Sequence, residues 1–282
     1  MMPYQRLLLV FLVLSTVVHS AQASLVAHWK LNDGKDGPTQ VVVDSSNSGF
    51  NGTLGASDKV GAEDGDPAWV TADMSTAKLD PVAKLGAVLQ FNNSGRGTFV
   101  NFNSHAAQIG RLNDYTIALW VRLKKSDIKG GPQSFISISD NTAKSTSATL
   151  CSDESPDKGS PRFLFRESGL PVGADLFPKT NPLTPEEWYH VAVTASPSAG
   201  VRLYVDGKEV AAKPDAIVTL SSLTDANDTI NTVILGANDD ERKGVHWRLA
   251  GCLSGVQIYD LALNPEQITF LADPKNLGTP VP

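Results

Sequence analysis

The segment from Trp188 to Val210 constrains the fold more than any other part of the chain, because its apolar residues recur at every second position. The pattern runs through 189–193, stops at a Ser-Pro-Ser-Ala-Gly turn, and resumes through 201–205. A period of two is typical of strands with one buried face. Asp206-Gly207 then tolerates the positive φ of a tight turn, after which 208–211 can form a further short strand. The segment is therefore predicted to be a three-stranded antiparallel meander.

The same alternation occurs along the rest of the chain. The clearest runs are Leu25–Leu31, Ala87–Phe91, Tyr115–Leu123, Thr232–Gly236 and Val256–Tyr259. One helix has a start signal, because Asn264 can cap it and Pro265 fits its first position; it is expected to end at Leu271. Residues 55–84 show little periodicity and are expected to form a long surface insertion that carries Trp69. Many short strands with one short C-terminal helix predict an all-β fold of two packed antiparallel sheets, a β-sandwich.

The composition allows one large core and argues against two classes of partner. At 282 residues with 41% hydrophobic side chains, the chain can form a single all-β domain. Its formal net charge is -6, and its Lys and Arg residues are scattered singly, without a basic stripe. Nucleic acids and anionic membrane surfaces are polyanionic, so neither would be attracted to this surface. Nucleic acid is therefore not an expected partner.

Residues 1–23 have the three parts of a secretory signal peptide. A basic start precedes the apolar run Leu7–Val18, and Ala21-Gln22-Ala23 is a small-residue cleavage pattern. A run of about a dozen apolar residues is shorter than the about 20 that span a bilayer. We therefore expect cleavage, a mature domain over 24–274 without a membrane span, and a short polar tail over 275–282. The mature protein would be secreted and extracellular, or periplasmic or on the cell surface if the source is bacterial.

Export would place the two cysteines, Cys151 and Cys252, in an oxidising compartment. A disulfide between them would close a loop of about 100 residues and stabilise the fold by up to about 4 to 5 kcal/mol in the chain-entropy model. We predict this disulfide. The alternative is two buried free thiols that act as small hydrophobic side chains.

Several stretches, taken in their order along the chain, resemble one known family. They are Leu25–Leu31, Val43–Ser46, Asn51–Leu54, Gly86–Phe91, Tyr115–Val121, Trp188–Val193, Val201–Gly207, Leu235–Ala237, Leu249–Tyr259 and Leu263–Ile268. Together they are similar to the laminin-G-like jelly roll of the concanavalin A-like lectin superfamily. The resemblance implies a jelly-roll sandwich and a ligand-binding or adhesion module. It does not decide the function, because this fold carries lectins, adhesive modules, calcium-dependent protein binders and glycan-processing enzymes.

An enzyme of that fold would need paired carboxylates. Enzyme relatives place the pair on one strand, at i and i+2 or i+4, so that both side chains point into one groove. The sequence has no such pair: Glu186-Glu187 are adjacent and face opposite ways, and Asp239-Asp240-Glu241 are expected in a loop. We therefore predict a protein that is not an enzyme. The alternatives are a glycoside hydrolase or lyase with an unfamiliar site, and a structural cell-surface or matrix component.

Calcium is the candidate cofactor, because it binds several oxygen ligands and the acidic loops of the chain offer them. Asp44 and Asp33 are the predicted metal ligands. For Asp44 the alternative is a carboxylate that caps its own turn with Ser46. The family often has an acidic residue just before its last strand, and this chain departs from that pattern with Ser254-Gly255.

Glycan binding requires an aromatic face for the C–H surface of a sugar, with charged or amide groups beside it for the hydroxyls. Trp247, His246, Arg242 and Asp240, around the loop before the last strand, are the predicted ligand-binding residues, and Trp69 is a second aromatic candidate. Core packing is the alternative for Trp247. The predicted function is a secreted, non-enzymatic binding module that recognises a glycan or an extracellular protein, with calcium assistance as a further expectation.

Overall fold

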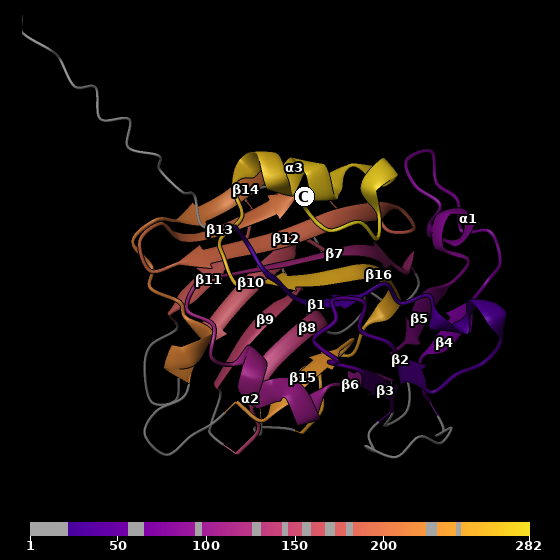
Figure 1. Cartoon of the computed structure of the whole chain (residues 1–282), viewed down its shortest axis with the longest axis horizontal. Helices are drawn as coiled ribbons and strands as arrows, with labels where there is room; N and C mark the ends of the chain where they lie inside the picture. Colours follow the sequence, from indigo (N-terminus) through magenta and orange to yellow (C-terminus); the bar gives the residue numbers. More distant parts are fainter. Residues whose placement is uncertain are drawn as a thin grey trace, which may run out of the picture.

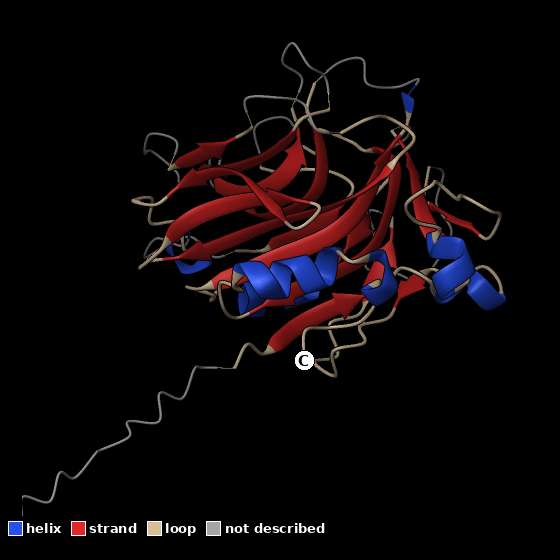
Figure 2. Cartoon of the chain, turned by 90° about the horizontal axis from the view of Figure 1, so that it is seen from above, coloured by secondary structure: helices blue, strands red, loops and turns tan. Residues whose placement is uncertain are grey.

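The computed structural model describes residues 22–55, 65–93, 98–125, 131–142, 146–153, 159–166, 173–178, 183–223, 230–240 and 244–282. Two antiparallel sheets pack face to face, and short α-helices lie outside them (Figures 1 and 2). No described helix has the length and apolarity of a membrane span. The predicted all-β sandwich is confirmed.

The first sheet, sheet A, has the order β14-β13-β12-β7-β16-β5-β4, and β1 also pairs with β16. Its strands are β1 (Leu25–Trp29), β4 (Ala68–Val70), β5 (Val88–Asn92), β7 (Tyr115–Leu123), β12 (Trp188–Ser196), β13 (Gly200–Val205), β14 (Lys208–Lys213) and β16 (Ala250–Tyr259). The predicted meander is confirmed as β12-β13-β14, in which Val191 pairs with Val205 and Leu203 with Ala211.

The second sheet, sheet B, has the order β11-β10-β9-β8-β15-β6-β3-β2. Its strands are β2 (Val41–Val42), β3 (Gly52–Leu54), β6 (Val100–Asn101), β8 (Gln133–Asp140), β9 (Thr146–Ser152), β10 (Pro161–Arg166), β11 (Ala174–Leu176) and β15 (Thr232–Leu235). The described α-helices are α1 (Pro81–Leu85), α2 (Ala106–Ile109) and α3 (Pro265–Ala272), and the described 3-10 helices are η1 (Asp33–Asp36), η2 (Asn103–His105), η4 (Leu220–Leu223) and η5 (Pro274–Asn276). The predicted C-terminal helix is confirmed as α3, where Asn264 and Gln267 form a capping box.

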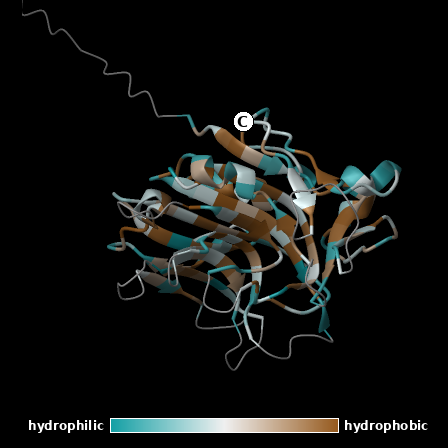
Figure 3. Ribbon diagram, turned by 90° about the horizontal axis from the view of Figure 1, so that it is seen from below, coloured by the Kyte–Doolittle hydropathy of each residue, from teal (hydrophilic) through white to brown (hydrophobic). Residues whose placement is uncertain are grey.

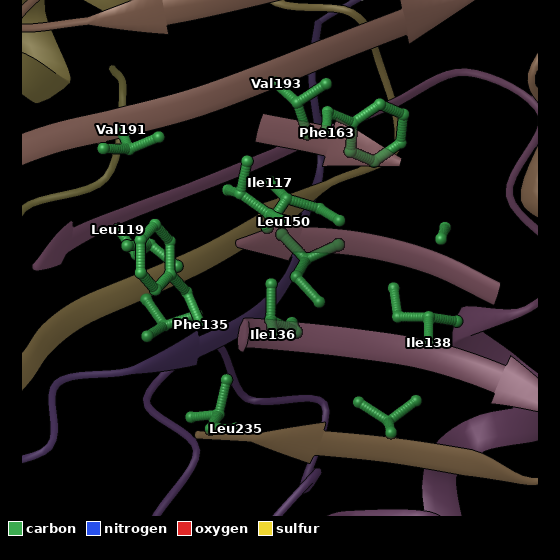
Figure 4. Packing of buried hydrophobic residues seen from close by; sticks show 14 of the residues in the cluster. Ile117, Leu119, Phe135, Ile136, Ile138, Leu150, Phe163, Val191, Val193 and Leu235 are labelled. Carbon is green, nitrogen blue, oxygen red and sulfur yellow. The ribbon is translucent and has the colours of Figure 1, made fainter. Parts of the chain in front are cut away.

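One continuous core of buried side chains fills the space between the sheets. Residues such as Ile117 and Val191 of sheet A face Phe135 of sheet B, as Figure 4 shows. Trp29, which is fully buried, stacks on Phe102 with ring centroids 3.9 Å apart. Hydrophobic residues are concentrated on the strands in Figure 3, whereas the loops at the rim are mostly hydrophilic. The period-two pattern of the sequence therefore identified the inward faces of the strands.

Sheet A is also covered on its outer face. Trp120 and Trp188 are buried there in a second apolar cluster. Residues 65–86 supply much of the cover through β4 and α1, so the part of the expected surface insertion that is described contains a strand and a helix. Leu277 joins the same cluster and is 2% exposed, which anchors the segment 275–282 that the sequence predicted to be a polar tail. Both segments are ordered because the outer face offers apolar surface for them to bury.

The predicted disulfide between Cys151 and Cys252 is wrong, because both residues are buried free thiols. Cys151 lies on β9 of sheet B, where its neighbour Leu150 points into the core. Cys252 lies on β16 of sheet A and belongs to the outer cluster. Successive side chains of a strand point to opposite faces, so each cysteine points away from the other sheet. Sheets pack about 10 Å apart, whereas the Cα atoms of a disulfide lie within about 7 Å of each other.

We expect two unreactive thiols in the folded protein. Burial raises the pKa of both Cys151 and Cys252 to about 12, so neither forms a thiolate at neutral pH. A thiol-reactive dye should label neither cysteine before unfolding and both after unfolding in guanidinium without a reductant. Protein that contains no reactive thiol after unfolding would contradict this arrangement.

Two buried histidines predict a loss of stability in mild acid. Burial, with a smaller contribution from a nearby lysine, lowers the pKa of His28 to about 4 and that of His190 to about 3. His28 Nε2 and His190 Nδ1 have no hydrogen-bond partner. Below pH 6.5 the unfolded chain therefore binds protons that the folded chain does not, so the stability present above this pH is lost as the pH falls.

We expect the free energy of unfolding to fall by about 2 to 3 kcal/mol per histidine between pH 6.5 and pH 4.5. Guanidinium unfolding at the two pH values measures the change, and His190→Gln should remove part of it because glutamine does not titrate. An unfolding free energy that stays constant down to pH 4.5 would contradict the prediction.

Candidate functional site

A cavity of about 530 Å³ lies where the edge strand β4 of sheet A meets the loop that follows β1. Its lining includes Trp69 of β4, Leu54 of β3, and Gly34, Lys35 and residues 37–40 of the loop after β1. In Figure 1 these elements gather at one end of the sandwich, with α1, β4 and β5 above β2 and β3. We call this cavity the Trp69 pocket. It joins residues that lie about 30 positions apart in the sequence, so no local pattern reveals it.

Trp69 is held by contacts on two sides. Its backbone pairs with Leu89 of β5, and its Nε1 donates a hydrogen bond to the carbonyl oxygen of Thr39 at 2.7 Å. Gly34 packs directly against the side chain, since a Cβ atom at this position would lie 2.1 Å from Trp69 Cγ. Only a glycine permits this approach. Asn32 Nδ2 also donates to the carbonyl oxygen of Leu85 at 3.0 Å, which ties the loop to the end of α1.

The pocket wall combines apolar and polar groups. The half-buried indole of Trp69 contributes aromatic surface, while Lys35, Thr39, Gln40 and Thr71 contribute an ammonium, two hydroxyls and an amide. Lys35 is exposed, and Thr39 and Gln40 are half-buried. These are the groups that can contact a small polar ligand with one apolar face. Of them, only Trp69 was among the predicted ligand-binding residues.

The second predicted region is the loop between β15 and β16. An isolated antiparallel bridge joins Asn238 to His246, and the ring of His246 meets that of Trp247 edge-on with centroids 5.2 Å apart. His246 Nε2 lies 3.6 Å from Asp240 Oδ1. The structure therefore brings together Asp240, His246 and Trp247, and Arg242 lies outside the described residues.

This cluster is mostly internal to the loop. Asp240 is 1% exposed and Asn238 is fully buried. Asn238 Oδ1 accepts a hydrogen bond from the Ser137 hydroxyl at 2.5 Å, and the carbonyl oxygen of Trp247 accepts one from the backbone N–H of Ser134 at 2.7 Å. These bonds attach the loop to β8 of sheet B. The cluster therefore has a clear structural role, whereas the Trp69 pocket offers open volume.

A family model matches residues 94–269, which is more than half of the chain, and its description is the concanavalin A-like lectin/glucanases superfamily. The chain belongs to this superfamily. No curated protein matches the chain in sequence.

Several solved structures, of carbohydrate-binding domains and of the binding domain of a mosquitocidal protein, share the superfamily fold seen here. The carbohydrate-binding module CBM40 of the Ruminococcus gnavus IT-sialidase, bound to α2,3-sialyllactose, is 16% identical with a TM-score of 0.55, over 71% of this chain and 100% of that one. Domain 4 of the Geobacillus stearothermophilus arabinanase AbnA, in complex with arabinotriose, is 18% identical with a TM-score of 0.56, over 89% of this chain and 100% of that one. The binding domain of Paraclostridial Mosquitocidal Protein 1 is 16% identical with a TM-score of 0.57, over 88% of this chain and 52% of that one. At these identities the likeness shows the fold alone.

The resemblance implies that an enzyme of this superfamily carries two carboxylates on one strand. Among the described residues, three strands carry a carboxylate, namely Asp140 on β8, Asp175 on β11 and Glu209 on β14, and each strand has only one. Asp175 is neutralised, because Arg162 contacts both of its carboxylate oxygens at 2.8 and 2.6 Å. The described strands therefore do not contain the paired arrangement.

Both carboxylate oxygens of Asp44, the first predicted metal ligand, already accept hydrogen bonds from the protein. Its Oδ1 accepts hydrogen bonds from the backbone N–H groups of His28 and Ser46, both at 2.9 Å. Its Oδ2 accepts from the Ser46 hydroxyl at 2.8 Å and from the backbone N–H of Phe50 at 3.0 Å. Burial alone would raise the pKa of Asp44, but these bonds hold it below its ordinary value. The bonds from Ser46 match the alternative in which Asp44 caps its own turn.

Asp33 is a single acidic side chain with one buried oxygen, Oδ2, that has no partner. The described residues contain no group of three or more His, Cys, Asp or Glu side chains that could hold a metal. Calcium binding at Asp33 and Asp44 therefore remains a prediction.

The hydrogen bonds of Asp44 predict a structural effect that does not depend on calcium. Asp44→Ala would leave buried donors without an acceptor and should lower the free energy of unfolding by about 3 kcal/mol. Asp36→Ala, at an exposed position in η1, is the matched control and should change it by less than about 0.5 kcal/mol. Denaturant unfolding in EDTA and in excess calcium measures both. A calcium-induced stabilisation that is lost only in Asp44→Ala would contradict this interpretation.

Proposed function

We propose that the protein is a non-catalytic carbohydrate-binding module whose ligand occupies the Trp69 pocket. The observation that carries the proposal is the composition of the pocket wall, in which an aromatic side chain lies beside hydroxyl, amide and ammonium groups. A sugar ring has apolar C–H faces and a polar edge, so it matches such a wall.

The size and the rigidity of the pocket support this function. A volume of about 530 Å³ lies within the range of small-molecule sites, and it accommodates a short oligosaccharide. The contact of Gly34 and the hydrogen bond to Thr39 hold Trp69 in place before a ligand arrives. A wall that is already ordered loses little conformational entropy on binding.

The comparisons support the same class of ligand. Proteins with a similar fold are described as bound to sialyllactose and to arabinotriose. One is a domain of an extracellular arabinanase, which agrees with the export that the N-terminal sequence predicts. The single carboxylates of the described strands favour binding over hydrolysis.

Trp69 should control glycan binding, and Trp247 should not. A glycan array with the purified protein identifies a ligand, and titration calorimetry then compares Trp69→Leu with the matched control Trp247→Leu. Leucine fills apolar space without an aromatic face, so Trp69→Leu should weaken binding about tenfold or more. Thermal unfolding of both variants establishes that they are folded.

Three results would count against the proposal. They are an array without any bound glycan, a loss of affinity only in Trp247→Leu, and the release of new reducing ends from a bound polysaccharide. The second result would place the ligand at the loop before β16, and the third would indicate an enzyme.

A further inference from the structure

We propose that the ligand of the Trp69 pocket is an anionic sugar, whose carboxylate or sulfate group pairs with Lys35. This inference rests on the proposed function and specifies its substrate class. Lys35 is the one charged side chain among the described lining residues, which include no Asp or Glu. The pocket therefore presents a positive charge on a protein whose formal net charge is -6.

The ammonium group of Lys35 is available to a ligand. Several other cations are engaged by carboxylates of the protein: Lys78 by Asp206, Arg122 by Glu186, Arg162 by Asp175, and Arg202 by Glu209. Lys35 has no such ion pair with any described residue and is exposed. An unpaired cation at a pocket gains more from an anionic ligand than one that must first leave an internal partner.

The neighbouring carboxylates do not line the pocket. Asp33 lies two residues before Lys35, and its carboxylate accepts a hydrogen bond from the backbone N–H of Val43 while its Oδ2 is buried. Asp36 follows Lys35 directly and Asp66 precedes the lining residue Pro67, and neither Asp36 nor Asp66 contributes to the lining. Asp33 interacts electrostatically with Lys35 and reduces the local positive potential, but Asp33 itself does not line the pocket.

Gly86 positions the stem of Lys35. A Cβ atom at Gly86 would lie 3.1 Å from Lys35 Cβ and 3.5 Å from Lys35 Cδ, so the aliphatic stem rests against the backbone that follows α1. Gly86 has a φ of +89°, a conformation that favours glycine and here also makes room for the stem. A lysine whose stem is already packed loses fewer rotamers when its ammonium group binds an anion.

Because the protein has a net negative charge, its preference for an anionic sugar has to come from groups in the pocket itself. Long-range attraction would draw in cationic ligands, so the selectivity for an anion depends on direct contact with Lys35. The contact lies at a half-exposed pocket, and salt should weaken it. A preference that persists at high salt would therefore come from hydrogen bonds and not from charge.

The test compares three oligosaccharides with one backbone: the neutral sugar, its C6-carboxylate counterpart and its C6-sulfate counterpart. We expect the wild-type protein to bind the anionic forms about tenfold more tightly than the neutral form. Lys35→Met, which keeps the stem and removes the charge, should bind the three sugars with nearly equal affinity. Lys35→Arg should keep most of the preference, and the tighter of the two anionic forms identifies the group that is recognised.

Lys208→Met is the matched control, because Lys208 is an exposed lysine on β14, at the opposite edge of sheet A from β4. It should keep the full preference. Equal affinities in the wild-type protein, or a preference that survives Lys35→Met, would overturn the inference. Trp69-dependent binding of neutral sugars would in that case leave the proposed function standing, whereas absence of any glycan binding would refute both.

Discussion

The constraint on which the rest of the structure depends is that sheet A has apolar side chains on both faces. Its central strand β7 is buried along its whole length except at Arg122, so one partner sheet is not enough to cover it. Sheet B covers the inner face, and the segment 65–86 with the C-terminal residues covers the outer one. Successive side chains of β4 contribute to both faces, because Val70 packs on the outer cluster while Trp69 packs against the main core. The pocket lined by Trp69 thus arises at the place where the cover reaches the edge of the sandwich.

The same covering explains why the two regions that the sequence singled out differ in character. The loop before β16 is bonded to sheet B, because Asn238 Oδ1 accepts hydrogen bonds from the hydroxyls of Ser137 and Thr149. The loop after β1 instead leaves space between itself and β4, since Gly34 lets the chain approach the indole while the residues after it turn away into solvent. Polar residues in the first loop stabilise the fold, and polar residues in the second remain available to a ligand.

The strands, the meander and the helix α3 could be predicted because period two and capping residues are local signals. The sequence could not decide between the alternatives for Cys151 and for Asp44. The answer depends on which face of the sheet a side chain occupies and on which backbone groups surround it. The cysteines share a compartment and a buried environment, and the sandwich core still keeps them apart. Trp69 could be proposed from its residue type alone, but Lys35 and Gln40 could not, since the turn that carries them meets β4 only in the folded chain. Asp240, His246 and Trp247 lie together because only seven positions of sequence separate the first from the last and a short bridge closes the loop.

The position of β16 has a consequence for how the chain acquires its structure. This strand pairs with β7, β5 and β1, so the middle of sheet A is completed by residues 250–259, close to the C-terminal end of the sequence. A growing chain that lacks residues 250–259 contains the other strands of sheet A, but not the strand that joins its two halves. Such non-local pairing makes folding slow, and it delays completion of sheet A until residues 250–259 have been synthesised. Removal of residues 250–259 would accordingly separate β5 and β1 from the meander and leave the edges of β7, β5 and β1 that now face β16 without a partner.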